Sequence, residues 1–302
     1  MSRRGWVLFI ALCVIWGIPY LLIRIAVREL SPPALVFFRT APAALVLMPF
    51  ALRAGDMRGL LAHWRWVLAY TLVELAVPWI LLSHAEQRLT SSMAGLMIAA
   101  VPLIAAVLYR FAGAHDPVDR RRVVGLVIGF AGVAALVGID LSGSAPLAIV
   151  EVLAVSLCYA TGPLIISRKL AGLPSLSVIT ASLVLTAALY AGPAALNLPS
   201  TVSAETVAAV AGLVLLCTSV AFILFFALIR EVGPSRTTVI TYVNPLVAVL
   251  LGVVLLGEPL TLGIAIGMPL ILVGSVVGTA PSLKRTAETA AAGEAGTGLP
   301  TP

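Results

Sequence analysis

Charged residues are scarce in this chain of 302 residues. Asp, Glu, Lys and Arg make up 11% of it, whereas soluble domains carry about 25%. Hydrophobic residues make up 61%, and the mean hydropathy is +1.10. This composition excludes a soluble domain of this length and predicts a membrane protein.

Cysteine and histidine are also rare. The three cysteines all fall within apolar segments: Cys13, Cys158 and Cys217. They form no C-x-x-C pair, which argues against a disulfide framework and a zinc site. The three histidines are all expected in loops, so we predict no histidine relay within the membrane: His63, His84 and His115.

Motifs that would carry an enzymatic reaction are missing as well. The sequence has no Walker A motif, so ATP cannot supply energy within this chain. It has neither G-x-S-x-G nor H-E-x-x-H, which argues against an intramembrane protease, and its acids are isolated rather than clustered for a metal. We therefore predict no enzyme, no cofactor and no metal.

What the chain has is ten apolar stretches of about 20 residues, the length a helix needs to cross roughly 30 Å of hydrocarbon. The fold class predicted is an all-α membrane protein with ten transmembrane helices. The expected spans are 6–23, 34–52, 66–83, 91–109, 123–139, 147–167, 175–195, 206–228, 237–256 and 260–280.

Basic residues are distributed unevenly between the loops. If the N-terminus is inside, 15 of the 19 Lys and Arg residues fall on the inner side. Arg24, Arg28 and Arg88 fall outside, and Arg39 lies within a span. This positive-inside pattern predicts that both termini are cytoplasmic. It also explains the net charge of +6 without nucleic acid as a partner.

An internal repeat appears at an offset of 142 to 143 residues. Its informative matches are Asp116-Pro117 with Glu258-Pro259, Gly125 with Gly267, Gly132 with Gly274 and Pro102 with Pro245. We predict one five-helix repeat in residues 1–140, an inverted second repeat in 141–280 and a disordered cytoplasmic tail in 281–302. Five spans per repeat is an odd number, so the second copy enters the membrane in the opposite orientation, as in many secondary transporters.

These motifs resemble those of a known family. Trp16-Gly17-Ile18-Pro19 followed by Pro32-Pro33 looks like the opening of an EamA-type repeat, and Gly257-Glu258-Pro259-Leu260-Thr261 looks like its close. The chain up to the tail resembles ten-helix members of the drug/metabolite transporter superfamily. The resemblance implies export of amino acids or other metabolites. The second half departs from the first, because Ala181 stands where the first half has Arg39.

Paired helix breaks are one place to look for a transporter site. Gly17 and Pro19 in span one correspond to Gly162 and Pro163 in span six, and Pro102 in span four corresponds to Pro245 in span nine. Simple bending of the helices is the alternative reading.

Polar and aromatic residues also form stripes at helical spacing. The four stripes are Tyr70, Thr71, Glu74 and Pro78; Trp16 and Tyr20; Ser156, Tyr159 and Pro163; and Thr238, Thr241, Tyr242 and Pro245. They predict a shared cavity near the midplane, with hydrogen bonding between helices as the alternative. Six aromatics would suit an amino acid or another amphipathic solute: Trp16, Tyr20, Trp79, Tyr159, Phe222 and Tyr242.

Glu74 is the most informative single residue. It is placed about 12 Å from the inner boundary, where an unpaired acid costs roughly 2.5–3.5 kcal/mol. A role on the substrate pathway, including proton coupling, is one interpretation, and an ion pair with Arg39 is the other. Outside the stripes, Glu151 is expected to be solvated or to snorkel near the outer end of span six. His84 and Glu86 are expected to be solvated loop residues at the outer mouth, with a gate as the alternative.

We therefore predict a secondary transporter in the cell's inner or plasma membrane that exports a small metabolite or amino acid by alternating access. A flippase for a lipid-linked substrate is the nearest alternative, and an intramembrane enzyme is less favoured. The partners expected are a small-molecule substrate, the lipid bilayer and protons. A homodimer stays open, because the glycines of spans five and ten predict close helix packing within the chain or between two copies.

Overall fold

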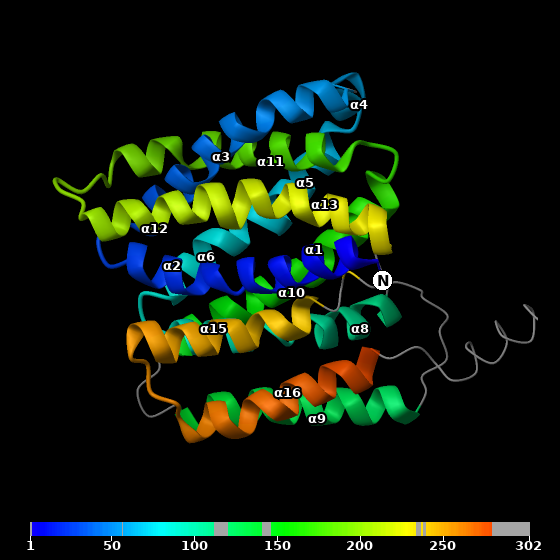
Figure 1. Cartoon of the computed structure of the whole chain (residues 1–302), viewed down its shortest axis with the longest axis vertical. Coiled ribbons are helices and arrows are strands. Elements are labelled where there is room, and N and C mark those ends of the chain that lie inside the picture. Colours follow the sequence, from blue (N-terminus) through cyan, green and yellow to red (C-terminus); the bar gives the residue numbers. More distant parts are fainter. Residues whose placement is uncertain are drawn as a thin grey trace, which may run out of the picture.

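The structure, a computed structural model, describes residues 2–55, 57–111, 120–140, 146–233, 237 and 240–279. Within these ranges every regular element is a helix (Figure 1). The predicted tail 281–302, the Asp116-Pro117 motif, His115 and Thr238 lie outside the described residues.

Among the described residues, helices lie within each of the predicted spans. In chain order they are α1 (Arg3–Ile15), α2 (Ile18–Ala26), α3 (Pro32–Ala54), α4 (Met57–Ala62), α5 (Trp64–Tyr70), η1 (Thr71–Ala76), α6 (Val77–Ala85), α7 (Ser91–Ile98), α8 (Val101–Phe111), α9 (Arg120–Asp140), α10 (Pro146–Lys169), α11 (Ser175–Ala195), α12 (Ala204–Val214), η2 (Leu215–Val220), α13 (Ala221–Val232), α15 (Ile240–Leu256) and α16 (Leu262–Thr279).

Seven of the helical segments are long and apolar enough to cross a membrane. They are Arg3–Ala26, Pro32–Ala54, Trp64–Ala85, Ser91–Leu108, Pro146–Lys169, Ser175–Ala195 and Ala204–Val232. Three further apolar helices are shorter: Val123–Gly138, Ile240–Leu256 and Leu262–Gly278.

Local sequence determines where several helices begin. Ser2, Ser31, Thr90 and Ser203 precede α1, α3, α7 and α12, and each side-chain oxygen accepts a hydrogen bond from the N–H three residues on. Such caps satisfy backbone donors that have no partner inside the helix. At the end of α13, Gly233 adopts a φ of +82°, which favours glycine.

The helix irregularities match the predicted breaks in the first half of the chain but not in the second. The first span is interrupted at Trp16 and Gly17, between α1 and α2, and the fourth at Ala99 and Ala100, between α7 and α8 and close to Pro102. The prediction of breaks in the matching second-half spans is wrong: α10 runs through Gly162 and Pro163, and α15 runs through Pro245, without interruption. A helix accommodates an interior proline by bending, because only one backbone hydrogen bond is lost.

Two π-helical turns interrupt spans three and eight instead. These are η1 and η2, and η2 lies 144 residues after η1, close to the offset of the internal repeat. A π-helical turn widens the helix and leaves backbone carbonyls to find other partners. The carbonyl of Ala76, at the end of η1, accepts a hydrogen bond from the Tyr190 hydroxyl of α11 at 2.9 Å.

Helices from the first and second parts of the chain pack against each other throughout the bundle. The contacting pairs are α2 with α12, α3 with α11, α6 with α10, α7 with α15, and α9 with α16. Figure 1 shows α9 and α16 side by side at one edge of the molecule. Their glycines are in contact, since a Cβ on Gly125 would overlap the backbone of Gly278 and one on Gly274 would overlap that of Gly129. The predicted glycine faces therefore meet within one chain.

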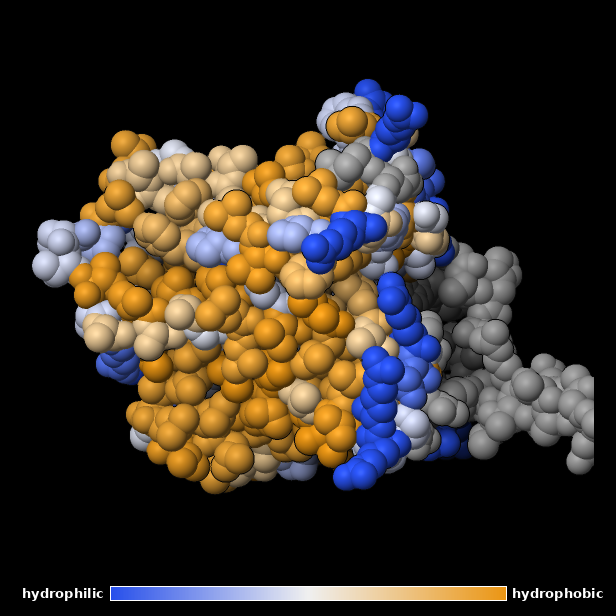
Figure 2. Space-filling view, turned by 45° about the horizontal axis from the view of Figure 1, so that its top comes forward, coloured by the Kyte–Doolittle hydropathy of each residue, from blue (hydrophilic) through white to orange (hydrophobic). Residues whose placement is uncertain are grey.

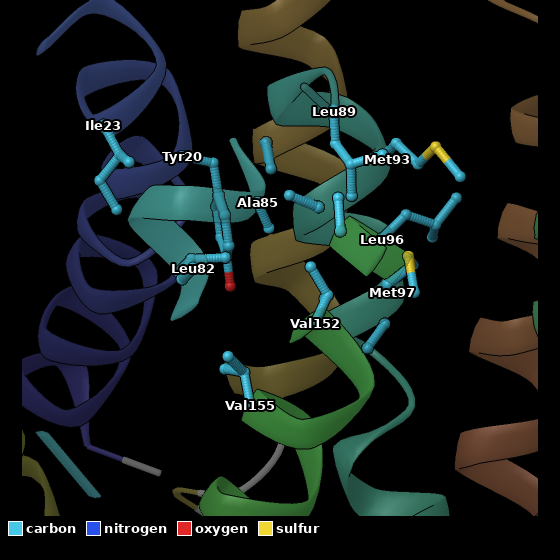
Figure 3. Close-up of a cluster of buried hydrophobic side chains, with 14 of the residues drawn as sticks. Tyr20, Ile23, Leu82, Ala85, Leu89, Met93, Leu96, Met97, Val152 and Val155 are labelled. Carbon is cyan, nitrogen blue, oxygen red and sulfur yellow. The ribbon is translucent and has the colours of Figure 1, made fainter. Parts of the chain in front are cut away.

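The outer surface and the interior are both apolar. Figure 2 shows a broad hydrophobic band across the middle of one face, with hydrophilic residues gathered mainly along the edge next to the residues drawn in grey. Figure 3 shows the interior, where Tyr20 of α2 reaches towards Leu82 of α6 and Val155 of α10. A hydrophobic band of this kind is what contact with lipid requires.

Candidate functional site

Arg39 is a buried cation in the centre of the bundle. Its side chain projects from α3 and is 8% exposed. Its Nε donates a hydrogen bond to the Thr218 Oγ1 of η2 at 3.1 Å, and its Cζ lies 3.6 Å from the centre of the Trp79 ring of α6. A guanidinium is suited to such a site because its plane stacks on an indole while its N–H groups stay free to donate.

Glu74 lies in η1 and is enclosed by protein. Its Oε2 is buried and has no hydrogen-bond partner among the described residues. The carboxyl group rests directly on Gly162 of α10, where a Cβ would overlap Oε2. Because Gly162 has no side chain, it makes the room that the carboxyl group occupies.

The predicted ion pair between Arg39 and Glu74 does not form. Arg39 contacts Thr218 and Trp79 instead, and the salt bridge found among the described residues is the one between His84 and Glu151. The carboxyl group of Glu74 is thus left beside Gly162 without a cation. Sequence reasoning placed both residues in the interior, but the direction of each side chain depends on how the helices are rotated.

Three tyrosines lie around these two charged side chains. Tyr159 of α10 is within electrostatic range of both Glu74 and Arg39. Tyr70 is within range of Glu74 and Tyr159, and Tyr20 is within range of Tyr159 and Arg39. One tyrosine from each of the stripes predicted on spans one, three and six therefore lies in this part of the interior.

The fourth stripe, on span nine, lies in α15. Thr241 and Tyr242 lie in the first turn of α15 and are partly buried. Pro245, one turn later, is buried, and Gly17 at the break between α1 and α2 packs against Val247 and the backbone carbonyl of Asn244. Span nine is thus in contact with the break in span one.

The remaining predicted residues are divided between the interior and the periphery. Trp16 packs on Phe225 with 4.8 Å between ring centres and meets Phe222 edge-on at 6.3 Å. Pro19 is buried near the start of α2, and Pro102 is partly buried near the start of α8. Pro163 is exposed, so it does not share the buried position of Gly162.

The two π-helical turns have different contacts, although they occupy matching places in the two halves of the chain. Arg39 of α3 hydrogen-bonds to Thr218 of η2, and α11 packs in turn against η1. Thr218 stands 144 residues after Glu74, and Ala181 of α11 is the counterpart of Arg39. Arg39 is therefore matched with a hydroxyl of η2, whereas Glu74 of η1 rests on Gly162 of α10, and α11 has Ala181 in place of a cation.

Near the end of the bundle opposite the N-terminus, several polar residues differ from the prediction that they are solvated. Glu86, directly after α6, is 0% exposed. Glu151 of α10 is 9% exposed, and the His84 Nδ1 lies 2.7 Å from its Oε1. For Glu86 and Glu151 the prediction was wrong, because packing in the bundle buries both side chains.

Glu258 joins the loop between α15 and α16 to the start of α7. Its two carboxylate oxygens accept hydrogen bonds from the backbone N–H groups of Ser91 and Ser92 at 2.7 and 2.9 Å. The two serine hydroxyl groups donate to it as well, at 3.0 and 2.5 Å. A carboxylate here satisfies orphan donors and opposes the positive end of the helix dipole.

Sequence reasoning missed Thr218, the buried state of Glu86 and the capping role of Glu258. Thr218 could have been found by aligning span eight with span three, because it stands opposite Glu74 in the repeat. No signal in the sequence distinguishes Glu86 from a solvated loop acid.

Chemically, the central site brings charged, polar and aromatic groups together. It combines a guanidinium, a carboxyl group, tyrosine hydroxyls and aromatic faces in an apolar surround. No group of three or more His, Cys, Asp or Glu side chains that could hold a metal ion occurs among the described residues.

Comparisons with known proteins place this geometry among membrane transporters. The EamA-like transporter family matches residues 3–138 and again residues 146–279. An Escherichia coli K12 protein named "Uncharacterized inner membrane transporter YedA" is 34% identical over 262 residues, which cover 83% of this chain and 82% of that protein.

Two further likenesses extend over nearly the whole chain. A protein of Archaeoglobus fulgidus named "Uncharacterized transporter" is 22% identical over 281 residues, covering 90% of this chain and 97% of the relative. A solved crystal structure shares the fold with a TM-score of 0.65 at 22% identity, and covers 92% of this chain and 97% of its own.

Proposed function

We propose, from the premise that this chain belongs to the EamA-like transporter family, that it is a secondary transporter which exports a small metabolite or amino acid by alternating access. The chain is a multi-pass inner membrane protein, as its apolar helices and its relatives indicate. We assign no catalytic reaction to it.

The proposed architecture is ten transmembrane helices in two inverted repeats, in residues 1–140 and 141–280, with both termini in the cytoplasm. Two separate matches to one family support the repeats. The pairing of α2 with α12 and of α6 with α10 supports them as well. A twofold axis between the repeats would relate span one to span six and span three to span eight, so it would convert the first of these contacts into the second. The excess of basic residues in alternate loops supports the orientation.

One observation carries the proposal: the buried carboxyl group of Glu74 has an oxygen without a partner, at a contact between two helices from different halves of the chain. An acid in a membrane interior is costly unless it is protonated, paired or solvated. Such residues mark substrate or ion pathways in transporters. Nothing in the packing requires an acid at this position, so we assign it a function.

The proposed mechanism uses the contacts between the halves. Arg39 anchors the first half to η2, and Glu74 faces α10 across Gly162. Rocking one repeat against the other would change the access of Glu74 from one side of the membrane to the other. A proton or the cationic group of a substrate would bind Glu74 in one state and leave in the other.

A flux measurement tests this role. Proteoliposomes that contain the purified protein should take up a metabolite identified by comparing secretion with and without the protein, and this uptake should depend on a pH gradient. Glu74→Gln should abolish the gradient dependence and retain the wild-type unfolding temperature, because the amide matches the carboxyl group in size. Glu205→Gln, at an exposed acid in the first turn of α12, is the matched control and should transport normally.

Unchanged gradient dependence in Glu74→Gln would eliminate the proton role. Single cysteines in place of Tyr70, Tyr159 and Thr241 test whether a wet cavity reaches these positions. We expect all three to react with a water-soluble thiol reagent and the substrate to protect them. Uniform inertness would mean a dry interior and would contradict the proposed pathway.

A further inference from the structure

Glu86 is a second buried acid, and it is separate from the central site. It follows α6 and lies outside the membrane-spanning segment Trp64–Ala85. Both of its carboxyl oxygens are buried without a hydrogen-bond partner among the described residues. The side chain is 0% exposed, although acids are almost never fully buried unless they are paired.

No charged group among the described residues forms a hydrogen bond with the carboxyl group of Glu86. Arg24 of α2 donates to the backbone carbonyl of Glu86 rather than to its carboxyl group. Glu258, from the loop between α15 and α16, is held by Ser91 and Ser92. Tyr20 of α2, Arg39 of α3 and Arg24 all lie within electrostatic range of Glu86.

The neighbouring helices add no direct partner. On α10, Glu151 is bound to His84 of α6, and Arg88 on the segment that follows Glu86 is exposed. Glu86 also sits at the C-terminal end of α6, where the helix dipole disfavours a negative charge.

These surroundings favour the neutral acid. Burial raises the pKa of Glu86 well above its usual range, and although the Arg24 and Arg39 charges oppose this, the Glu258 charge adds to it. A metal cation is a poor alternative, because hard cations need six or more oxygen ligands, and no cluster of acids able to hold a metal occurs in the described part of the chain.

We infer that Glu86 is a proton-binding site of this protein, distinct from Glu74, which holds and exchanges a proton at the face of the bundle opposite the N-terminus. This inference does not depend on the substrate or on the role of Glu74. It predicts a neutral carboxyl group at pH 7 in a position where sequence patterns suggest a solvated carboxylate.

The pH dependence of unfolding tests the inference without any transport measurement. In the unfolded chain a glutamate loses its proton above a pH of about 4.3, whereas the folded protein keeps the proton on Glu86. The folding equilibrium of the wild type should therefore fall by about tenfold per pH unit as the pH rises, until the folded pKa is reached. Glu86→Gln cannot lose a proton, so its folding equilibrium lacks this dependence on pH.

We therefore expect the apparent Tm of Glu86→Gln to match that of the wild type near pH 5 and to exceed it increasingly up to pH 9. Glu205→Gln, at an exposed acid, should keep the wild-type slope. A charged Glu86 stabilised by Arg24 would give the opposite result: Glu86→Gln would be the less stable protein, and its deficit would be as large at pH 9 as at pH 7. That outcome would overturn the inference.

A second measurement uses the wild type, in case Glu86→Gln fails to fold. Dicyclohexylcarbodiimide reacts with protonated carboxyl groups in apolar surroundings, and mass spectrometry of peptides locates the adduct. We expect Glu86 to be labelled at pH 7 and labelling to fall at higher pH, while exposed Glu205 stays unlabelled. No labelling of Glu86 between pH 5 and 9 would refute the proton site and would leave the flux experiments on Glu74 unaffected.

Discussion

At the residue scale, two charged side chains in the centre of the bundle differ in the contacts that they make. Arg39 donates from its Nε to a hydroxyl and stacks on an indole ring, so its burial is matched by specific contacts. Glu74 has an orphan oxygen and rests on a glycine. An unsatisfied buried polar group costs about 1–3 kcal/mol, which a purely structural residue would not be expected to retain.

A double-mutant cycle tests the contact between Glu74 and Gly162. Gly162→Ala should destabilise the protein by about 1–3 kcal/mol, because the new methyl group would overlap the Glu74 carboxyl group. Glu74→Ala removes that obstacle, so the double variant should recover most of the loss in thermal unfolding measured in detergent. Additive effects of the two changes would show that the side chains do not touch.

At the element scale, irregular helix geometry marks the site more clearly than proline does. The π-helical turns η1 and η2 carry Glu74 and Thr218, and both face helices from the other half of the chain. The prolines of α10 and α15 lie within continuous helices. Widened turns place polar groups at helix contacts because they shift the side chains that follow by part of a turn.

The contact between α9 and α16 gives an element-scale prediction with a matched control. Gly274→Ala should cost about 3 kcal/mol or more, because its methyl group would overlap the backbone of Gly129, which cannot move independently of its helix. Gly138→Ala, in α9 where nothing lies within 4 Å of a Cβ, should be neutral or stabilising by about 0.5–1 kcal/mol. Equal effects on the unfolding temperature would contradict this packing.

At the scale of the whole molecule, the chain is a bundle in which each half completes the other. The first and second halves contact each other through α2 and α12, α3 and α11, α6 and α10, α7 and α15, and α9 and α16, and Glu258 from the second half caps α7 of the first. An alternating-access transporter requires such an interface, since its two halves must move relative to one another while the bundle stays closed to lipid.

Membrane topology tests the proposed orientation. Single cysteines replacing Arg58, after α3, and Thr201, before α12, should react on opposite sides of the membrane. A thiol reagent that does not cross the membrane, added to intact cells, should label Thr201→Cys and should label Arg58→Cys only after the cells are opened. Labelling of both positions in intact cells would exclude the ten-helix arrangement with a cytoplasmic N-terminus.

The sequence alone determined the class of protein and the approximate positions of its helices. Twenty apolar residues in succession allow few structures in lipid other than a helix, because every backbone polar group must be satisfied within the segment. The charge difference between loops and the internal repeat followed from composition and spacing, the EamA-like character of that repeat came from its resemblance to a known family, and none of these needs any knowledge of packing.

Only the tertiary structure decided which polar side chains meet. The rotation of each helix about its axis left Glu74 on Gly162 and brought Arg39 to Thr218 rather than to Glu74. The overlap of neighbouring helices buried Glu86, which its place after a predicted span had suggested was solvated. These outcomes depend on contacts between residues more than 60 positions apart, and helical periodicity within one segment carries no information about them.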